Sequence, residues 1–211
     1  LLLFITPHII DGPIQSEQAS KEIKSQYSDI VFNYFYLNTA TRKDIISLYI
    51  NHIYNNLVNK FFEKNRMLGK SDSTIKKEMP VWLQREKSAY FAEKLAEAIV
   101  QYRNVRGPFT KYEDLQNVYF YFMNQPMNIK EDLYEELVAN TRLNININLV
   151  NVEELTRALS FVDNYNYSIA QNIINDRNYL GYFKDKEQAR YYIIKNGVSE
   201  QQYQAKLAPV I

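Results

Sequence analysis

The chain has no cysteine among its 211 residues, which excludes a disulfide framework and a thiolate metal site. Five glycines and six prolines are too few for a turn-rich β-fold and favour long helices. The two histidines, His8 and His52, are far apart in the sequence, and neither a Gly-x-Gly-x-x-Gly motif nor a P-loop occurs. We therefore predict no metal site, no cofactor and no catalytic group.

Charge of either sign is not in excess. The chain has 25 Lys and Arg against 24 Asp and Glu, a formal net charge of +1. Proteins that bind duplex DNA gain affinity by clustering Lys and Arg against phosphates, so this balance disfavours nucleic acid as a partner. Adjacent acids are predicted in first helical turns or on exposed helix faces, where they are common, namely Glu113-Asp114, Glu135-Glu136 and Glu153-Glu154. They do not indicate acid catalysis, and we expect a non-enzymatic protein.

Long hydrophobic runs are also missing. No segment approaches the roughly 20 apolar residues that a transmembrane helix needs. Residues 1–6 read Leu-Leu-Leu-Phe-Ile-Thr and permit two interpretations: the end of a trimmed signal or anchor segment, or a segment that packs on the core. The first interpretation favours a periplasmic or membrane-associated location, with membrane association through this apolar N-terminal segment.

Aromatic side chains are abundant instead, with 18 tyrosines and 11 phenylalanines. A buried tyrosine contributes a large apolar area, but its hydroxyl needs a partner, so we expect many of these rings in half-buried seams between helices. Trp82 is either a core anchor or an interface hot spot. Residues 116–122 are too aromatic for one buried stripe. The candidate interface residues are therefore Trp82, Tyr119, Tyr121 and Phe122.

Helices are predicted from their starts. In a capping box, a Ser, Thr, Asn or Asp side chain accepts a hydrogen bond from a free backbone amide of the first turn. The side chain of an acid or amide three residues later accepts one from the backbone amide of the capping residue. Six such pairs precede apolar residues at helical spacing: Thr41 with Asp44, Thr110 with Glu113, Asn128 with Glu131, Asn151 with Glu154, Ser168 with Gln171 and Ser199 with Gln202. With Gly and Pro as terminators, they predict helices near residues 41–65, 80–106, 111–123, 129–141, 152–161, 168–179, 185–195 and 199–207, and a linker with at most one short turn at 67–80.

Residues 143–149 alternate aliphatic and asparagine side chains, a period of two that is typical of a β-strand. The sequence offers no evident second strand to satisfy the amides of this one. We therefore expect an extended connector, with pairing to the edge strand of a partner as the alternative.

An internal repeat is the most informative pattern. Residues 38–45 align with residues 148–155 at an offset of 110, and both segments contain Asn, a small or apolar pair and an N-cap. Residues 96–103 align with residues 170–177 at an offset of 74, and the following Gly-x-Phe turns share that offset. The difference between the offsets means that the first copy carries about 36 extra residues between its halves.

Each repeated position has a packing or capping role in this interpretation. The alanines allow close approach of helices, and the isoleucines three residues later lie on the same face. The arginines occupy a last helical turn, where they can meet free carbonyls, the glycines reverse the chain, and the phenylalanines fill the helix junction. The predicted structural core of the repeat comprises Ala96, Ile99, Arg103, Gly107 and Phe109 in the first copy and Ala170, Ile173, Arg177, Gly181 and Phe183 in the second.

These residues resemble the tandem helix-hairpin-helix (SAM-like) repeats of ComEA-type competence proteins. They are also similar to repeats in type II secretion protein K, photosystem II protein U and helix-hairpin-helix proteins of Bacteroidetes. The motifs that carry the resemblance are Asn38-Thr39-Ala40, Tyr102-Arg103, Gly107-Pro108-Phe109 and Glu113-Asp114-Leu115 in the first copy, and Asn148, Glu153-Glu154-Leu155 and Gly181-Tyr182-Phe183 in the second.

The resemblance implies an all-α fold of two helix-hairpin-helix repeats, the first with an insertion of extended helices. It divides the chain into an N-terminal apolar segment and helix (residues 1–35), a first degenerate repeat with the insertion (36–142) and a second degenerate repeat (143–211).

The hairpins depart from the family pattern. Family members that bind DNA hold a phosphate on the amides of a Gly-hydrophobic-Gly hairpin. In the second copy, Asp163 would repel phosphate and the glycine is missing, although Asn164 and Asn166 permit a hairpin. We therefore expect a structural or protein–protein assembly module, a subunit of a larger, membrane-linked bacterial complex. The alternative is a competence-type DNA-binding protein.

Overall fold

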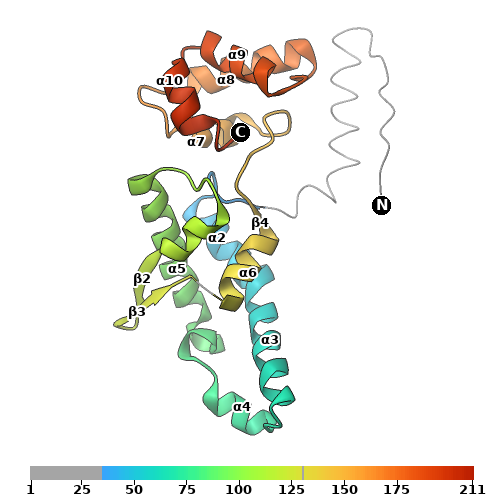
Figure 1. Cartoon of the computed structure of the whole chain (residues 1–211), viewed down its shortest axis with the longest axis vertical. Helices are drawn as coiled ribbons and strands as arrows, with labels where there is room; N and C mark the ends of the chain where they lie inside the picture. The colour runs from blue at the N-terminus through green and yellow to red at the C-terminus, as the bar shows by residue number, and fades with distance from the viewer. Residues whose placement is uncertain (1–34, 130) are drawn as a thin grey trace, which may run out of the picture. The chain divides into compact units, whose positions relative to one another are not determined.

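The computed structural model describes residues 35–129 and 131–211, and these residues are mostly helical, with two short two-stranded sheets (Figure 1). The expectations for the apolar start, for a helix before residue 35 and for His8 fall outside the described residues. The described residues form two compact units. We call residues 35–145 with 204–211 the larger unit and residues 146–203 the smaller unit. The sequence predicted a boundary between residues 142 and 143, and the two units divide between residues 145 and 146. The sequence did not predict that residues 204–211 belong to the larger unit.

The predicted helix after Thr41 is present, with a change of pitch in its middle. Helix α2 (Arg42–Leu48), a π-helical turn (Tyr49–Ile53) and helix α3 (Tyr54–Met67) follow one another without a break. The capping box forms as expected, because the Thr41 hydroxyl accepts from the Asp44 amide at 3.2 Å and the Asp44 carboxylate accepts from the Thr41 amide at 2.7 Å.

The segment predicted as a linker contains a seven-residue helix. Helix α4 (Asp72–Glu78) begins at Ser71, whose hydroxyl accepts from the Thr74 amide at 3.3 Å. A 3₁₀ turn (Val81–Leu83) then leads from Pro80 into the 22-residue helix α5 (Arg85–Arg106). The linker prediction gave too little weight to the Ser71 cap and to Ile75, which is fully buried.

The helix predicted for residues 111–123 is wrong in its second half. A 3₁₀ helix (Tyr112–Asn117) is followed by strand β2 (Tyr119–Phe122), which pairs antiparallel with strand β3 (Gln125–Asn128). The two turn residues, Met123 and Asn124, both have positive φ, as the central residues of a tight hairpin require. Exposed and buried rings alternate along β2, as they do in a strand with one buried face, and this pattern is not that of a helix.

Helix α6 (Glu131–Asn140) follows the hairpin, close to its predicted range. Strand β4 (Thr141–Arg142) comes next and pairs in parallel with strand β1 (Phe35–Tyr36). These two short sheets apart, the described part of the chain is mostly helical, which is consistent with the predicted all-α class.

The smaller unit consists of helices. Helices α7 (Val152–Leu159), α8 (Tyr167–Leu180), α9 (Lys186–Lys195) and α10 (Glu200–Gln202) fall within a few residues of their predicted ranges, and a π-helical turn (Tyr203–Leu207) follows. Asn151 and Ser199 act as the predicted N-caps. The cap of α8 is Asn166 rather than Ser168, since the Asn166 side chain accepts from the Ile169 amide at 3.1 Å.

Two further predicted boxes are also corrected. The Asp114 carboxylate, not that of Glu113, accepts from the Thr110 amide at 3.2 Å. Asn128 lies at the end of β3 rather than at a helix start. Asp114 thus replaces its neighbour Glu113 in the first of these boxes. The second is replaced by the end of a strand.

A cluster of aromatic rings lies within the mainly aliphatic core of the larger unit. Phe91 on α5 is fully buried, and its ring centroid lies 5.1 Å from that of Trp82, 5.3 Å from that of Tyr49 and 5.3 Å from that of Phe122. Trp82 is partly exposed and packs against this core, as the core-anchor interpretation expects. No helix in the described ranges is long and apolar enough to cross a membrane.

A polar contact holds α6 against α3. The Glu136 carboxylate, whose side chain is 7% exposed, lies 2.7 Å from the Lys60 ammonium and accepts from the side-chain Nδ2 of Asn56 at 3.0 Å. One turn further along, the Lys64 ammonium lies 2.9 Å from Asp132. The hydrogen bond to Glu136 raises the pKa of Lys60. These contacts fix the position of α3 within the larger unit.

The alternating segment after β4 forms no strand, but it is only partly the extended connector that was predicted, since it bends at residues 143–144 and makes a turn at residues 147–149. Leu143, Ile145 and Ile147 are buried, whereas Asn144 and Asn146 are exposed. Within the larger unit, the Ile145 amide donates to the carbonyl of Val210 at 2.6 Å. Burial thus alternates from Leu143 to Ile147, and the alternation ends where the chain turns at residues 147–149.

Candidate functional site

The first candidate site lies in the larger unit, where the side chain of Asn38 closes a long loop. Its Nδ2 donates to the carbonyls of Phe109 at 2.9 Å and Leu143 at 3.0 Å, and its Oδ1 accepts from the Phe109 amide at 2.7 Å. Asn38 is 1% exposed and Phe109 is fully buried. This one side chain therefore satisfies backbone groups that would otherwise be buried without partners.

Arg103 makes the second set of closing contacts. Its guanidinium donates to the carbonyl of Leu37 at 2.6 Å and to that of Ala40 at 3.0 Å, one residue before and two residues after Asn38. Arg103 lies in the last turn of α5, as predicted. The carbonyls that it meets belong to the segment before α2, more than 60 residues earlier, and not to the end of its own helix.

The smaller unit makes equivalent contacts with the asparagine and arginine side chains, although the bond of Asn38 to the Leu143 carbonyl has no counterpart there. The Nδ2 of Asn148 donates to the carbonyl of Phe183 at 2.9 Å, and its Oδ1 accepts from the Phe183 amide at 2.8 Å. The Arg177 guanidinium donates to the carbonyl of Ile147 at 3.0 Å and to that of Val150 at 2.7 Å. These carbonyls again lie one residue before and two residues after the asparagine. We call each set of contacts an Asn–Arg closure.

The remaining repeat positions have matching surroundings. Ala96, Ile99, Ala170 and Ile173 are all fully buried on their helices. Gly107 and Gly181 follow α5 and α8 with φ of 92° and 84°, a backbone region that favours glycine. Burial lowers the pKa of Arg177, yet a guanidinium stays charged in proteins, so its carbonyl partners offset the loss of water.

The two closures differ in the ring that packs on the phenylalanine. Phe109 stacks on Tyr102, which precedes the turn, with centroids 5.1 Å apart and planes at 7°. Phe183 contacts Tyr192, which follows the turn on α9, with centroids 5.6 Å apart. An aromatic neighbour is kept in both units, but it comes from opposite sides of the glycine.

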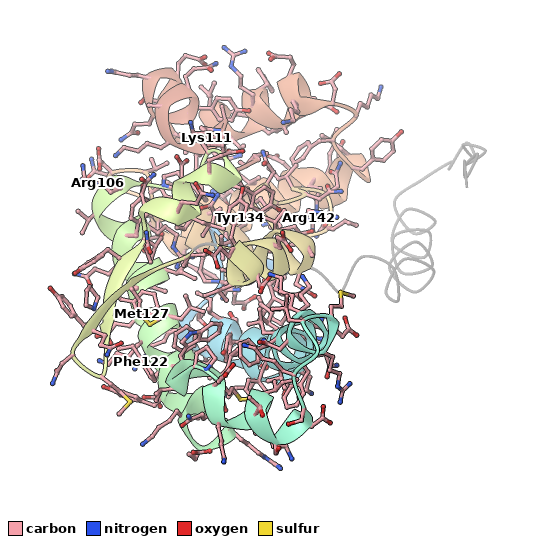
Figure 2. The ribbon with its side chains drawn as sticks, turned by 60° about the horizontal axis from the view of Figure 1, so that its bottom comes forward. Arg106, Lys111, Phe122, Met127, Tyr134 and Arg142 are labelled. Atoms are coloured by element: carbon pink, nitrogen blue, oxygen red, sulfur yellow. The ribbon has the colours of Figure 1, made fainter. Side chains whose placement is uncertain are left out.

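The second candidate site is the β2–β3 hairpin. Tyr119 and Tyr121 are 56% and 60% exposed, and their ring centroids lie 5.3 Å apart in an edge-to-face contact. A hydrogen bond with Tyr121 raises the pKa of Tyr119. Phe122 is 4% exposed and points into the core, as does Met127 on the paired strand (Figure 2). Phe122 is therefore removed from the candidate interface.

The third candidate is the hairpin between α7 and α8. Residues 163–168 are all exposed, and Asn164 has a φ of 61°, the left-handed conformation expected at such a turn. The Asp163 carboxylate accepts from the Gln202 side chain at 3.4 Å. No Lys or Arg occurs between Arg157 and Arg177, so the hairpin brings no positive charge to a phosphate.

Within residues 35–129 and 131–211, no group of three His, Cys, Asp or Glu side chains could hold a metal ion. His52 lies exposed in the π-helical turn, with its ring 6.3 Å from that of Phe35. The acidic pairs occur at helix starts or in ion pairs with lysines, as the contact of Glu136 with Lys60 illustrates.

Two features of these sites were missed in the sequence. The closing role of Asn38 and Asn148 could have been found, because an asparagine stands three residues before the N-cap in both copies. The hairpin could have been found from the Tyr-Phe-Tyr-Phe alternation before Asn124.

Comparison of this chain with protein-family models, curated proteins and solved structures gives no match.

Proposed function

We propose that this chain is a non-enzymatic structural or protein–protein assembly module, a subunit of a larger bacterial complex, built on two degenerate helix-hairpin-helix (SAM-like) repeats. The observation that carries the proposal is the duplicated Asn–Arg closure. In both units the polar atoms of an asparagine and an arginine bind backbone groups of their own unit. The repeated residues thus serve to hold helices in place, which suits a scaffold.

The exposed face of β2 is the contact surface that we assign to the partner. Phe120 and Phe122 anchor the strand on the core, so Tyr119 and Tyr121 are presented on a rigid support. Tyrosine is enriched at protein interfaces because it offers a large contact area at a small cost in side-chain entropy. Pro126 and Asn128, opposite these tyrosines on β3, are exposed as well and extend the same face.

The test is quantitative co-purification from the native source with three tagged full-length chains: wild type, the double variant Tyr119→Ser/Tyr121→Ser, and Tyr179→Ser. Tyr179 is 82% exposed and lies in the smaller unit, so it is a matched control for loss of a surface ring. A partner that the wild type and Tyr179→Ser recover, and that the double variant loses, is the expected result. A wild-type chain that stays monomeric, or equal recovery by all three chains, would contradict the proposal.

The second candidate function is DNA binding of the competence type, which the left-handed Asn164 in the α7–α8 hairpin favours. Its discriminating measurement is an electrophoretic mobility shift with a short duplex at low salt. Binding that weakens steeply with salt would support this function. We expect no shift, because Asp163 is the charged residue of the exposed hairpin.

A further inference from the structure

The turn between α3 and α4 exposes two apolar side chains next to each other. Met67 is 86% exposed and Leu68 is 73% exposed, among the highest values for large hydrophobic residues in the described chain. The next residue, Gly69, has a φ of 77°, and a Cβ built on it would meet no atom within 4 Å. Figure 1 shows this turn at the end of α3 that lies away from β4. The apolar pair therefore stands at a tip with open space around it.

This tip is a well-formed structure. The Gly69 amide donates to the Arg66 carbonyl at 2.9 Å, and the Lys70 amide donates to the Asn65 carbonyl at 3.2 Å. The Arg66 guanidinium meets the Asp72 carboxylate through two bonds of 2.8 Å across the turn. The exposure of Met67 and Leu68 is thus imposed by an ordered turn, which presents them to a partner at little cost in ordering.

Positive charge surrounds the tip. Residues 66–78, from the end of α3 to the end of α4, contain four Lys and Arg against two Asp and Glu, a net charge of +2 in a chain whose total is +1. Lys60 and Lys64, earlier on α3, are offset by Glu136 and Asp132 of α6. Lys76 and Lys77 are exposed in the last turn of α4. The ion pairs of Arg66 and Lys70 are solvent-exposed, and such pairs are weak enough to exchange for other anions.

We propose that the α3–α4 tip docks on an anionic lipid surface, with Met67 and Leu68 inserted at the interface and the surrounding cations against the headgroups. An apolar pair gains free energy on leaving water, and basic residues near an anionic bilayer add to it. Nucleic acid would use the cations but leave the apolar pair in water, so a lipid surface accounts for both features. This docking is peripheral and is independent of the assembly role proposed above.

The experiment is co-sedimentation of the full chain with vesicles of phosphatidylcholine alone or mixed with phosphatidylglycerol. We expect binding to the mixed vesicles that weakens as salt rises. Met67→Ser/Leu68→Ser should lower the partition coefficient by at least about tenfold. Lys76→Gln/Lys77→Gln should lower it by roughly tenfold.

Two controls make the result specific to the tip. Val105→Ser removes an apolar side chain that is 74% exposed at the end of α5, and it should leave binding unchanged. Removal of residues 1–6, the other apolar segment, should also leave it unchanged. Circular dichroism checks that each variant is folded. The proposal is overturned if the mixed vesicles do not bind the chain, if neutral vesicles bind it equally well, or if the tip variant binds like the wild type.

Discussion

Replacement of Asn38 by Ala tests whether the closure holds the larger unit together. The change removes three hydrogen bonds and leaves the Phe109 amide, the Phe109 carbonyl and the Leu143 carbonyl without their side-chain partner. All three bonds are buried, so water cannot easily replace the lost groups. The equivalent change in the smaller unit, Asn148→Ala, removes two bonds that are only partly buried.

The expected magnitudes follow from this difference in burial. A buried polar group left without a partner costs about 1–3 kcal/mol. Asn38→Ala should therefore lower the free energy of unfolding by about 3–6 kcal/mol, and Asn148→Ala by about 1–3 kcal/mol. The first value is a large share of the roughly 5–15 kcal/mol that stabilises an ordinary domain. Asn144→Ala is the matched control: Asn144 is exposed in the same connector, and the effect should stay within about 0.5 kcal/mol.

Urea denaturation distinguishes the units, because the single tryptophan, Trp82, lies in the larger one. Its fluorescence should show an earlier transition in Asn38→Ala, and far-ultraviolet circular dichroism should report the loss in Asn148→Ala. The reasoning is refuted if Asn38→Ala costs less than about 1 kcal/mol, or if Asn148→Ala is the more damaging of the two.

Three further predictions concern single residues. Burial raises the pKa of Tyr49, so stability should fall as pH rises above the ordinary tyrosine value of about 10; Tyr49→Phe should reduce that alkaline loss and leave neutral-pH stability equal or higher, since its buried hydroxyl has no hydrogen-bond partner, and a lower neutral-pH midpoint would contradict this. Glu136→Gln removes the ion pair with Lys60 and should cost about 1–2 kcal/mol in urea denaturation, less at high salt; an unchanged midpoint would contradict a stabilising role for this ion pair. Phe122→Ala should cost about 3–5 kcal/mol, whereas Tyr121→Ser should stay within about 0.5 kcal/mol; similar thermal shifts would contradict the assigned strand faces.

Sequence reasoning located most helices because their caps are local. Thr41 with Asp44 and Asn151 with Glu154 form reciprocal capping boxes, and the chemistry of each box is contained in four residues. It failed at residues 119–122, where the strand depends on a partner after a two-residue turn and on a helix that its buried rings contact. Aromatic richness alone could not distinguish a helix from a strand there.

The candidate sites were predictable only in part. The positions of Arg103 and Arg177 in last helical turns were evident from spacing. Their acceptor carbonyls, however, lie 63 and 66 residues away for Arg103 and 27 and 30 residues away for Arg177. Such long-range pairs have no local signal, although the repeat itself pointed to Asn38 and Asn148. The exposure of Met67 and Leu68 could not be seen either, because an apolar pair beside a glycine reads equally well as a buried helix end.

The closing bond between asparagine and phenylalanine has a consequence for how this chain can change in length. It spans 71 residues in the larger unit and 35 in the smaller one, yet its geometry is the same. Because closure entropy grows only logarithmically, the longer loop costs about 0.6 kcal/mol more, before the packing of its added helices is counted. A unit fastened at its two ends can therefore accept new segments between them, and the stretch between α7 and α8 is a natural place to graft a foreign peptide.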